Sequence, residues 1–273
     1  MITSRRPAFF YIWRMDFKKK ALGFGARILR IAGILLVIYI SMVFYLALTE
    51  RRNAFPRAIT HKEAREAIAD KAKSISCTME DGTVLEGWTT GKSSDATLLY
   101  YPDADEDAAQ FIAEVQELEG TALVAFNYRG SGNNKGTPSE ETFEPDARGI
   151  FECASQLNGQ PAYLAGRGTG AILAAEQSGK EKNLILIDPV SSIADAVSAK
   201  YRLLYPSFLV RANVAMPREK LANAGNRTVL LVDRKMFSDR NHKFHKDFGQ
   251  IRMVERGEKN LRRTLSILTN EGL

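Results

Sequence analysis

The sequence predicts an α/β domain in which helices flank a mostly parallel sheet with an opening β-hairpin, preceded by one N-terminal transmembrane helix. Three observations lead to this prediction. From residue 74 onward, apolar runs of strand length alternate with segments of helical periodicity, an order typical of parallel sheets. The first two strand patterns flank the turn residues Asp81 and Gly82, which indicates a hairpin. Residues 31–48 form an uncharged apolar run of nearly transmembrane length.

The individual elements follow from short β-branched or aromatic runs and from apolar residues at helical spacing. Strands are expected at residues 74–79, 84–89, 97–101, 122–128, 162–166, 184–187, 228–232 and 251–254. Helices are expected at residues 107–118, 145–157, 169–178, 238–248 and 261–268. The resulting organisation is a basic segment (1–30), a transmembrane helix (31–48), a linker with a short helix (49–73) and an α/β domain (74–273).

The net charge of +6 comes from the N-terminus. Residues 1–30 contain eight Lys or Arg and one Asp, so they carry +7, and the rest of the chain sums to −1. A nucleic-acid-binding domain would gather its basic residues on the folded domain itself. The distribution therefore excludes nucleic acid as an expected partner, while 45% hydrophobic residues fit a domain with a sizeable core.

The apolar run 31–48 predicts a membrane anchor with the main domain on the extracytoplasmic side. At about 1.5 Å per residue it nearly spans the hydrocarbon core of a bilayer. A cleaved signal peptide is the alternative, but the basic segment is long and no small-x-small cleavage site follows the run. Eight basic residues precede the run, whereas Arg51, Arg52 and Arg57 follow it. The positive-inside rule then places the N-terminus in the cytoplasm and predicts a single-pass membrane protein.

The chain has two cysteines, Cys77 in an expected strand and Cys153 in an expected helix. Their spacing matches no C-x-x-C motif, so the sequence leaves open whether they are bridged. An extracytoplasmic location would permit their oxidation.

The most informative motif is Gly166-Arg167-Gly168-Thr169-Gly170, between an apolar strand and a helix of small residues. In serine hydrolases, a G-x-S-x-G turn at such a junction lifts the serine hydroxyl into the substrate pocket beside backbone N–H donors. Gly168 stands at the serine position and has no hydroxyl for the attack. Thr169 is the candidate substitute nucleophile, although its side chain is expected to begin the helix and point elsewhere. The motif lacks the spacing of G-x-G-x-x-G and the lysine of a phosphate-binding loop, so no cofactor is expected.

Further motifs resemble one family. The stretch 127–132, Asn-Tyr-Arg-Gly-Ser-Gly, with Gly-Thr-Pro-Ser-Glu at 136–140, is similar to the loop signature of membrane-anchored serine hydrolases of the BEM46 and ABHD13 type. Asp146 matches the aspartate that follows this loop in the family, and the hairpin around 81–88 matches its opening strands. The resemblance covers residues 74–262. It implies the α/β-hydrolase fold with a short helical lid, here the insertion at about 199–218.

The resemblance also implies a Ser-His-Asp triad, and all three of its positions are replaced. The nucleophile position is Gly168, the acid position after the next-to-last strand is Met236, and the base position after the last strand is Lys259. Asp233 is the weak substitute for the acid. The family's oxyanion turn corresponds to residues 102–104, where Asp103 would place negative charge beside the developing anion and oppose the reaction.

Several residues are candidates for binding rather than catalysis. Gly168, Thr169 and Gly170 offer backbone N–H groups at a helix N-terminus to an anionic ligand. Arg129 either orients such a ligand or forms a buried ion pair with Asp146. The apolar residues of the lid insertion either line a pocket for an acyl chain or cap the core.

We therefore expect a membrane-anchored, catalytically degenerate α/β-hydrolase-like protein that binds an acyl or anionic small ligand or an envelope protein. The alternative is an active esterase, lipase or peptidase-like hydrolase that uses non-standard residues such as Thr169, Asp233 or Lys259. His242 and His245 are three residues apart on an expected helix and have no evident third ligand, so no metal site is expected.

Overall fold

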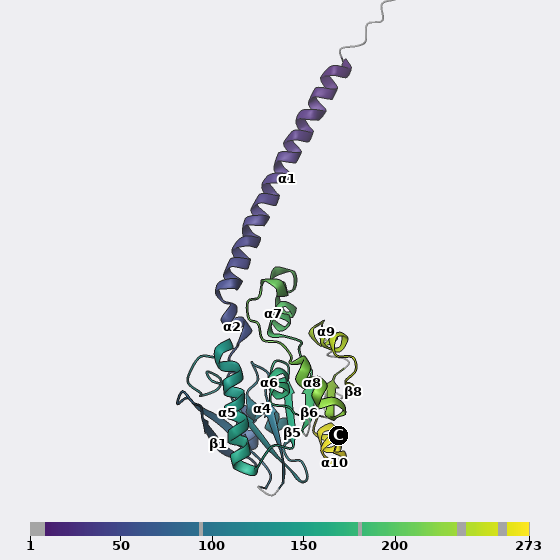
Figure 1. Cartoon of the computed structure of the whole chain (residues 1–273). Coiled ribbons are helices and arrows are strands. Elements are labelled where there is room, and N and C mark those ends of the chain that lie inside the picture. Colours follow the sequence, from purple (N-terminus) through teal and green to yellow (C-terminus); the bar gives the residue numbers. More distant parts are fainter. Residues whose placement is uncertain (1–8, 93–94, 180–181, 234–238, 256–260, 273) are drawn as a thin grey trace, which may run out of the picture. The chain divides into compact units, whose positions relative to one another are not determined.

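The computed structural model describes residues 9–92, 95–179, 182–233, 239–255 and 261–272. The chain divides into two compact units, Met1–Leu48 and Thr49–Leu273, which are described separately. Figure 1 shows the elements of both units along the chain.

The first unit contains the helix α1 (Phe9–Leu48), which begins well before the expected segment 31–48. Its part Phe24–Leu48 has 25 residues and contains an 18-residue window with a mean hydropathy of 2.6, so it is long and apolar enough to cross a membrane. At about 1.5 Å per residue this part extends over roughly 37 Å, more than the roughly 30 Å of a hydrocarbon core. Many of its large apolar side chains, such as Leu29 and Val37, are exposed. Length and composition thus fit a membrane anchor or a signal sequence.

The second unit is built on one eight-stranded sheet with the order β1-β2-β4-β3-β5-β6-β7-β8. The strands are β1 (Lys73–Thr78), β2 (Val84–Thr89), β3 (Ala96–Tyr101), β4 (Thr121–Phe126), β5 (Tyr163–Arg167), β6 (Asn183–Ile187), β7 (Thr228–Val232) and β8 (Arg252–Glu255). β2 pairs antiparallel with both β1 and β4, and all other neighbours are parallel. The eight expected strands and the opening hairpin are therefore confirmed.

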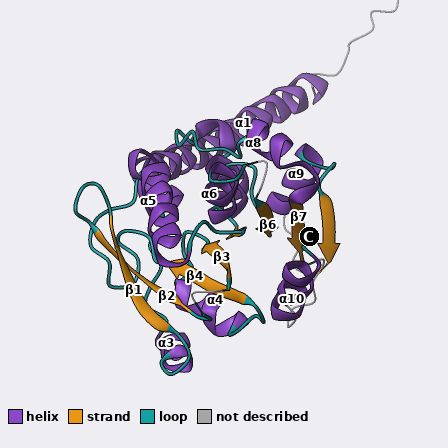
Figure 2. Ribbon diagram, turned by 60° about the horizontal axis from the view of Figure 1, so that its bottom comes forward, coloured by secondary structure: helices purple, strands orange, loops and turns teal. Residues whose placement is uncertain are grey.

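Helices cover both faces of the sheet, so its central strands are buried on both sides (Figure 2). The helices of this unit are α2 (Glu50–Ala54), α3 (Lys62–Ile68), α4 (Ala108–Val115), α5 (Glu140–Asn158), α6 (Gly170–Glu176), α7 (Ile193–Tyr201), α8 (Arg218–Ala224), α9 (Asp239–Asp247) and α10 (Leu261–Glu271). On one face, α3, α4 and α10 pack on the strands through Ile68, Phe111 and Leu265. α5, α6 and α8 lie on the other face. Near-continuous apolar strands such as residues 184–187 are explained by this double burial.

Several helix boundaries differ from the expectation, most of all at the start of α5. α5 begins at Glu140 instead of residue 145, because Ser139 and Thr142 cap its first turn through a 3.1 Å bond from the Ser139 N–H to the Thr142 hydroxyl. Pro145 then lies inside the helix, near its N-terminus, where its missing N–H removes one backbone bond. α7 begins at Ile193, so helical structure precedes the expected insertion at 199.

The open question about the cysteines has a structural answer. Cys77 on β1 and Cys153 on α5 form a disulfide with a Cα–Cα distance of 6.0 Å, across a sequence separation of 76 residues. The bridge ties the edge strand of the sheet to the helix that covers it.

Candidate functional site

The glycine motif forms the sharp turn between β5 and α6 that its sequence indicates. Gly168 adopts a φ of +56°, which favours glycine, and its N–H donates to the Ile187 carbonyl at 3.0 Å. A Cβ atom at Gly170 would come within 2.2 Å of the Pro102 carbonyl oxygen. The absence of a side chain at Gly170 therefore allows the backbone of the turn to pack directly against the loop that follows β3.

That loop places the Asp103 carboxylate inside the turn. Its Oδ1 accepts hydrogen bonds from the Thr169 N–H (2.9 Å), the Thr169 hydroxyl (2.7 Å) and the Ala104 N–H (2.9 Å). A Cβ atom built on Gly168 would lie 2.0 Å from Asp103 Oδ2. The carboxylate thus occupies the space that a side chain at position 168 would need.

The two backbone donors that contact Asp103 have a known use in turns of this kind. In a serine hydrolase, the N–H after the nucleophile and an N–H from the loop after the third strand stabilise the oxyanion. Here these groups belong to Thr169 and Ala104, and both donate to the Asp103 carboxylate. An anionic ligand at this position would have to displace a charged side chain of the protein itself.

Thr169 is buried, and its side chain points toward Asp103 instead of away from the turn. The hydroxyl donates to Asp103 and accepts from the Ala104 N–H at 3.2 Å. The threonine therefore binds the two sides of the turn together.

An ion-pair cluster supports the same loop. Arg167 contacts Glu106 at 2.7 Å and Glu114 at 2.8 Å. Glu106 also accepts from the Tyr100 hydroxyl (2.7 Å) and from the Asp103 N–H (3.0 Å). Burial raises the pKa of Glu106, an effect that the nearby Arg167 opposes. We did not anticipate this cluster, although the acidic residues after β3 and the arginine in the glycine motif were visible signals.

The acid and base positions are described only in part. Asp233 lies buried at the end of β7, and its N–H donates to the Asp188 carboxylate at 3.3 Å. Asp188 follows β6 and was not anticipated; parallel pairing of β6 and β7 brings the two aspartates to the same edge of the sheet. Met236 and Lys259 lie outside the described residues.

Arg129 forms the expected buried pair with Asp146 and also contacts Asp81. Nε and Nη2 donate to the two oxygens of Asp146, and Nη1 lies 2.7 Å from Asp81 Oδ2. The hydrogen bond from Arg129 lowers the pKa of Asp81 to about 2. The guanidinium thus connects the opening hairpin, the loop after β4 and α5, and these contacts support the structural reading of Arg129.

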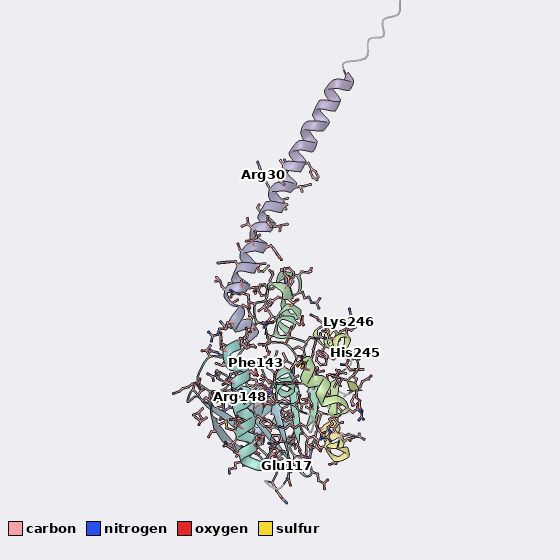
Figure 3. The ribbon with its side chains drawn as sticks, viewed as in Figure 1. Arg30, Glu117, Phe143, Arg148, His245 and Lys246 are labelled. Carbon is pink, nitrogen blue, oxygen red and sulfur yellow. A yellow bond between two sulfur atoms is a disulfide. The ribbon has the colours of Figure 1, made fainter. Side chains whose placement is uncertain are left out.

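The histidines do not gather. His61 precedes α3, where its Nδ1 accepts from the Ala64 N–H at 3.2 Å. His242 and His245 lie on α9, and Figure 3 shows His245 at the outer edge of the domain. Among the residues that the structure describes, no group of three or more potential metal ligands is present.

The sequence of this chain is only weakly similar to those of the known proteins that it matches. No family model matches the chain. Over 210 residues it is 27% identical to the uncharacterised protein Rv2307c of Mycobacterium tuberculosis, a match that covers 70% of this chain and 75% of that protein.

Solved structures are more informative. An esterase from Pyrococcus furiosus matches with a TM-score of 0.56 at 15% identity, covering 80% of this chain and 93% of its own. The thioesterase domain from the curacin biosynthetic pathway matches at 0.51 and 15% identity, covering 73% and 99%. The haloalkane dehalogenase DatA from Agrobacterium tumefaciens matches at 0.50 and 12% identity, covering 76% and 99%. The chain has the α/β-hydrolase fold. At these identities the likeness shows the fold and not the activity.

In this α/β-hydrolase fold, the lid consists of α7 followed by two short 3-10 turns, η1 (Arg202–Leu204) and η2 (Ser207–Leu209). We call residues 202–211 the lid loop. Tyr205 at its centre is buried, and its hydroxyl donates to Glu50 Oε2 at 2.7 Å. Leu203 and Phe208 are 89% and 82% exposed. The insertion therefore caps the domain only through some of its apolar residues.

Glu50 joins the lid loop to α2 through several hydrogen bonds. Its carboxylate accepts from the N–H groups of Arg211 (2.7 Å) and Ala212 (3.0 Å) as well as from Tyr205. In addition, the Tyr201 hydroxyl donates to Asn53 Oδ1 at 2.8 Å. One short helix thus carries several polar contacts of the lid.

We expect the contribution of Glu50 to stability to depend on pH. Burial raises its pKa, but the hydrogen bonds from Tyr205, Arg211 and Ala212 outweigh burial and lower the pKa below the ordinary 4.5. A lowered carboxyl pKa means stabilisation above the ordinary value that disappears as pH falls through the folded-state value. Chemical unfolding of the wild type and Glu50→Gln at several pH values measures this. The difference in unfolding free energy should be largest near neutral pH and shrink below pH 4.5; a constant difference would contradict the assignment.

Proposed function

We propose that this protein is a membrane-anchored member of the BEM46 and ABHD13 type of α/β-hydrolase-like proteins that has lost serine hydrolysis and serves as a binding or interaction scaffold. The observation that carries the proposal is the Asp103 carboxylate, which accepts hydrogen bonds from the Thr169 and Ala104 N–H groups and fills the space beside Gly168.

This arrangement opposes each step of acyl transfer. Gly168 supplies no nucleophile. The oxyanion that forms in the transition state needs donors within hydrogen-bond distance, but both backbone donors already face a negative charge. Thr169 does not replace the serine, because the carboxylate oxygen that would take its proton is the same oxygen that occupies the oxyanion donors.

The same contacts favour an interaction scaffold over a protein that holds a ligand at the turn. The N–H groups of residues 168–170, the candidates for an anionic ligand, include a donor already bound to Asp103. Arg129 is engaged by Asp146 and Asp81.

We also propose that the domain lies on the extracytoplasmic side, with the N-terminus in the cytoplasm. The charge difference across Phe24–Leu48 supports this orientation. The Cys77–Cys153 disulfide supports it independently, because such bridges persist in oxidising compartments.

The test is labelling of the full chain in detergent with a fluorophosphonate, combined with hydrolysis of esters of several acyl lengths. We expect neither labelling nor turnover in the wild type. Turnover that scales with protein concentration and disappears in Thr169→Ala would contradict the proposal and establish an unorthodox hydrolase.

A double-mutant cycle tests the role of Asp103 directly. Gly168→Ser should lower the free energy of unfolding by about 1–3 kcal/mol, because the new side chain meets the carboxylate in a packed turn. Adding Asp103→Ala should recover part of this loss, so that the two substitutions couple by about 1–3 kcal/mol. Chemical denaturation measures all four proteins. Strictly additive effects would mean that Asp103 does not occupy this space.

A scaffold role requires a partner that binds the protein in stoichiometric amounts. Crosslinking followed by purification of the full chain from solubilised membranes should recover a protein partner. If neither a partner nor a retained small molecule is found by native mass spectrometry, the scaffold part of the proposal fails even when hydrolysis is absent.

A further inference from the structure

Two exposed apolar side chains of the lid loop have an unusual setting. Leu203 lies in η1 and Phe208 in η2, and both stand almost fully in solvent. Between them, the Tyr205 side chain is buried, with its hydroxyl 2.7 Å from Glu50 Oε2 and 3.2 Å from the Leu209 carbonyl oxygen. A buried anchor between two turns restrains the loop while the turns present their apolar side chains outward. Two large apolar side chains held outward by one restrained loop make this loop a candidate for contact with an apolar phase.

Covalent connectivity places this loop near the membrane. Glu50 follows Leu48, the last residue of the apolar helix, by two positions. Since consecutive Cα atoms are about 3.8 Å apart, Glu50 stays within about 8 Å of the end of that helix at any angle between the two units. Glu50 also binds the N–H groups of Arg211 and Ala212, and α2 lies beside α7 within the domain (Figure 1). The lid loop is therefore hydrogen-bonded to Glu50, in the short segment that directly follows the apolar helix.

The charge of the lid fits a lipid surface. Residues 196–217 contain Lys200, Arg202 and Arg211 and no acidic residue. All three side chains are exposed, that of Arg211 to 76% although it contacts Glu50. Apolar side chains flanked by basic ones are typical of segments that lie in the headgroup region of a bilayer and contact anionic lipids.

We propose that the lid loop docks onto the bilayer that holds the anchor, with Leu203 and Phe208 inserted among the lipid headgroups and Arg202 and Arg211 against lipid phosphates. The inference rests on the membrane anchoring in the proposed function and is independent of whether the protein hydrolyses esters. It turns the domain from one tethered at a single point into one held at two adjacent points.

A fluorescence experiment on the full chain tests this docking. The chain is reconstituted, at less than one copy per vesicle, into phosphatidylcholine and phosphatidylglycerol vesicles with a quencher on the lipid chain. An environment-sensitive label is placed at Ser207→Cys between the two apolar side chains. The control label is at Leu157→Cys, an exposed position close to the end of α5. The start of α5 contacts the lid region through Glu140, so Leu157 lies about 26 Å away along the helix axis.

Docking predicts strong quenching at Ser207 and little at Leu157. The variant Leu203→Ser/Phe208→Ser should reduce quenching at Ser207 to the level of the control, and its exposed substitutions should leave chemical unfolding unchanged. Equal quenching at the two positions in the otherwise unchanged chain would overturn the proposal. In that case Leu203 and Phe208 do not contact the bilayer, and a protein that covers them in cells would be the remaining explanation of their exposure.

Alkaline extraction of the same vesicles separates the two possible failures. A chain that remains in the pellet without quenching at Ser207 contradicts docking alone. A chain that is extracted contradicts the anchor, and docking with it. Ester hydrolysis is measured on the same samples, so the loss of hydrolysis is judged independently of both results.

Discussion

Replacement of Arg129 with methionine should lower the free energy of unfolding by about 3–5 kcal/mol, the cost of leaving a buried charge without its partner. The side chains of Arg129 and Asp146 are 8% and 6% exposed, so water cannot replace the lost guanidinium at the Asp146 carboxylate. The change also removes the contact that lowers the pKa of Asp81. Chemical denaturation of the full chain in detergent measures the loss.

The control for this prediction is Arg57→Met. Arg57 is an exposed arginine that reaches the same loop through a 3.0 Å bond to the Thr137 hydroxyl. Its removal should cost less than about 0.5 kcal/mol, as is usual at exposed sites. The double variant Arg129→Met/Asp146→Leu should recover stability, because no unpaired charge remains. Equal effects of Arg129→Met and Arg57→Met would show that the pair is not buried in solution.

Removal of the disulfide is the second change with a large expected effect. For a loop of 76 residues, Cys77→Ala/Cys153→Ala should lower the free energy of unfolding by about 4 kcal/mol, since the unfolded chain regains the conformational freedom that the bridge removes. The thermal midpoint of the full chain, measured with and without reductant, tests this prediction.

Reductant provides the matched control. It should destabilise the wild type as much as the double variant is destabilised, and it should have no effect on the variant itself. Alkylation of both thiols in native, unreduced protein would contradict the bridge and remove one support for an extracytoplasmic domain.

Local patterns predicted most of the fold. The central strands are short, mainly apolar runs buried on both faces, and their positions follow from composition alone. Helix ends were less predictable, because the start of α5 depends on a cap at Ser139 that outweighs Pro145. The sequence also indicated the Arg129–Asp146 pair, because both residues belong to a recognisable loop signature.

The candidate site was predicted only in outline. The sequence placed an acidic residue in the oxyanion turn, but not the contact of Asp103 with Thr169 and Gly168, which are more than 60 positions away. Such contacts depend on how two loops meet in space. Similarly, the apolar composition of the lid loop does not predict that Tyr205 is buried while Phe208 is exposed. That difference depends on the contact of Tyr205 with Glu50, which lies in a distant segment of the chain.

The position of Asp103 has an evolutionary consequence. A return of serine to position 168 places its side chain against the carboxylate, whereas a loss of Asp103 alone leaves a turn without a nucleophile. Neither single step restores a reaction on which selection could act. Under the proposed loss of hydrolysis, this contact makes a return of the reaction harder, because serine at position 168 and removal of Asp103 are both needed in addition to changes at Met236 and Lys259. Selection then acts on the other properties of the fold.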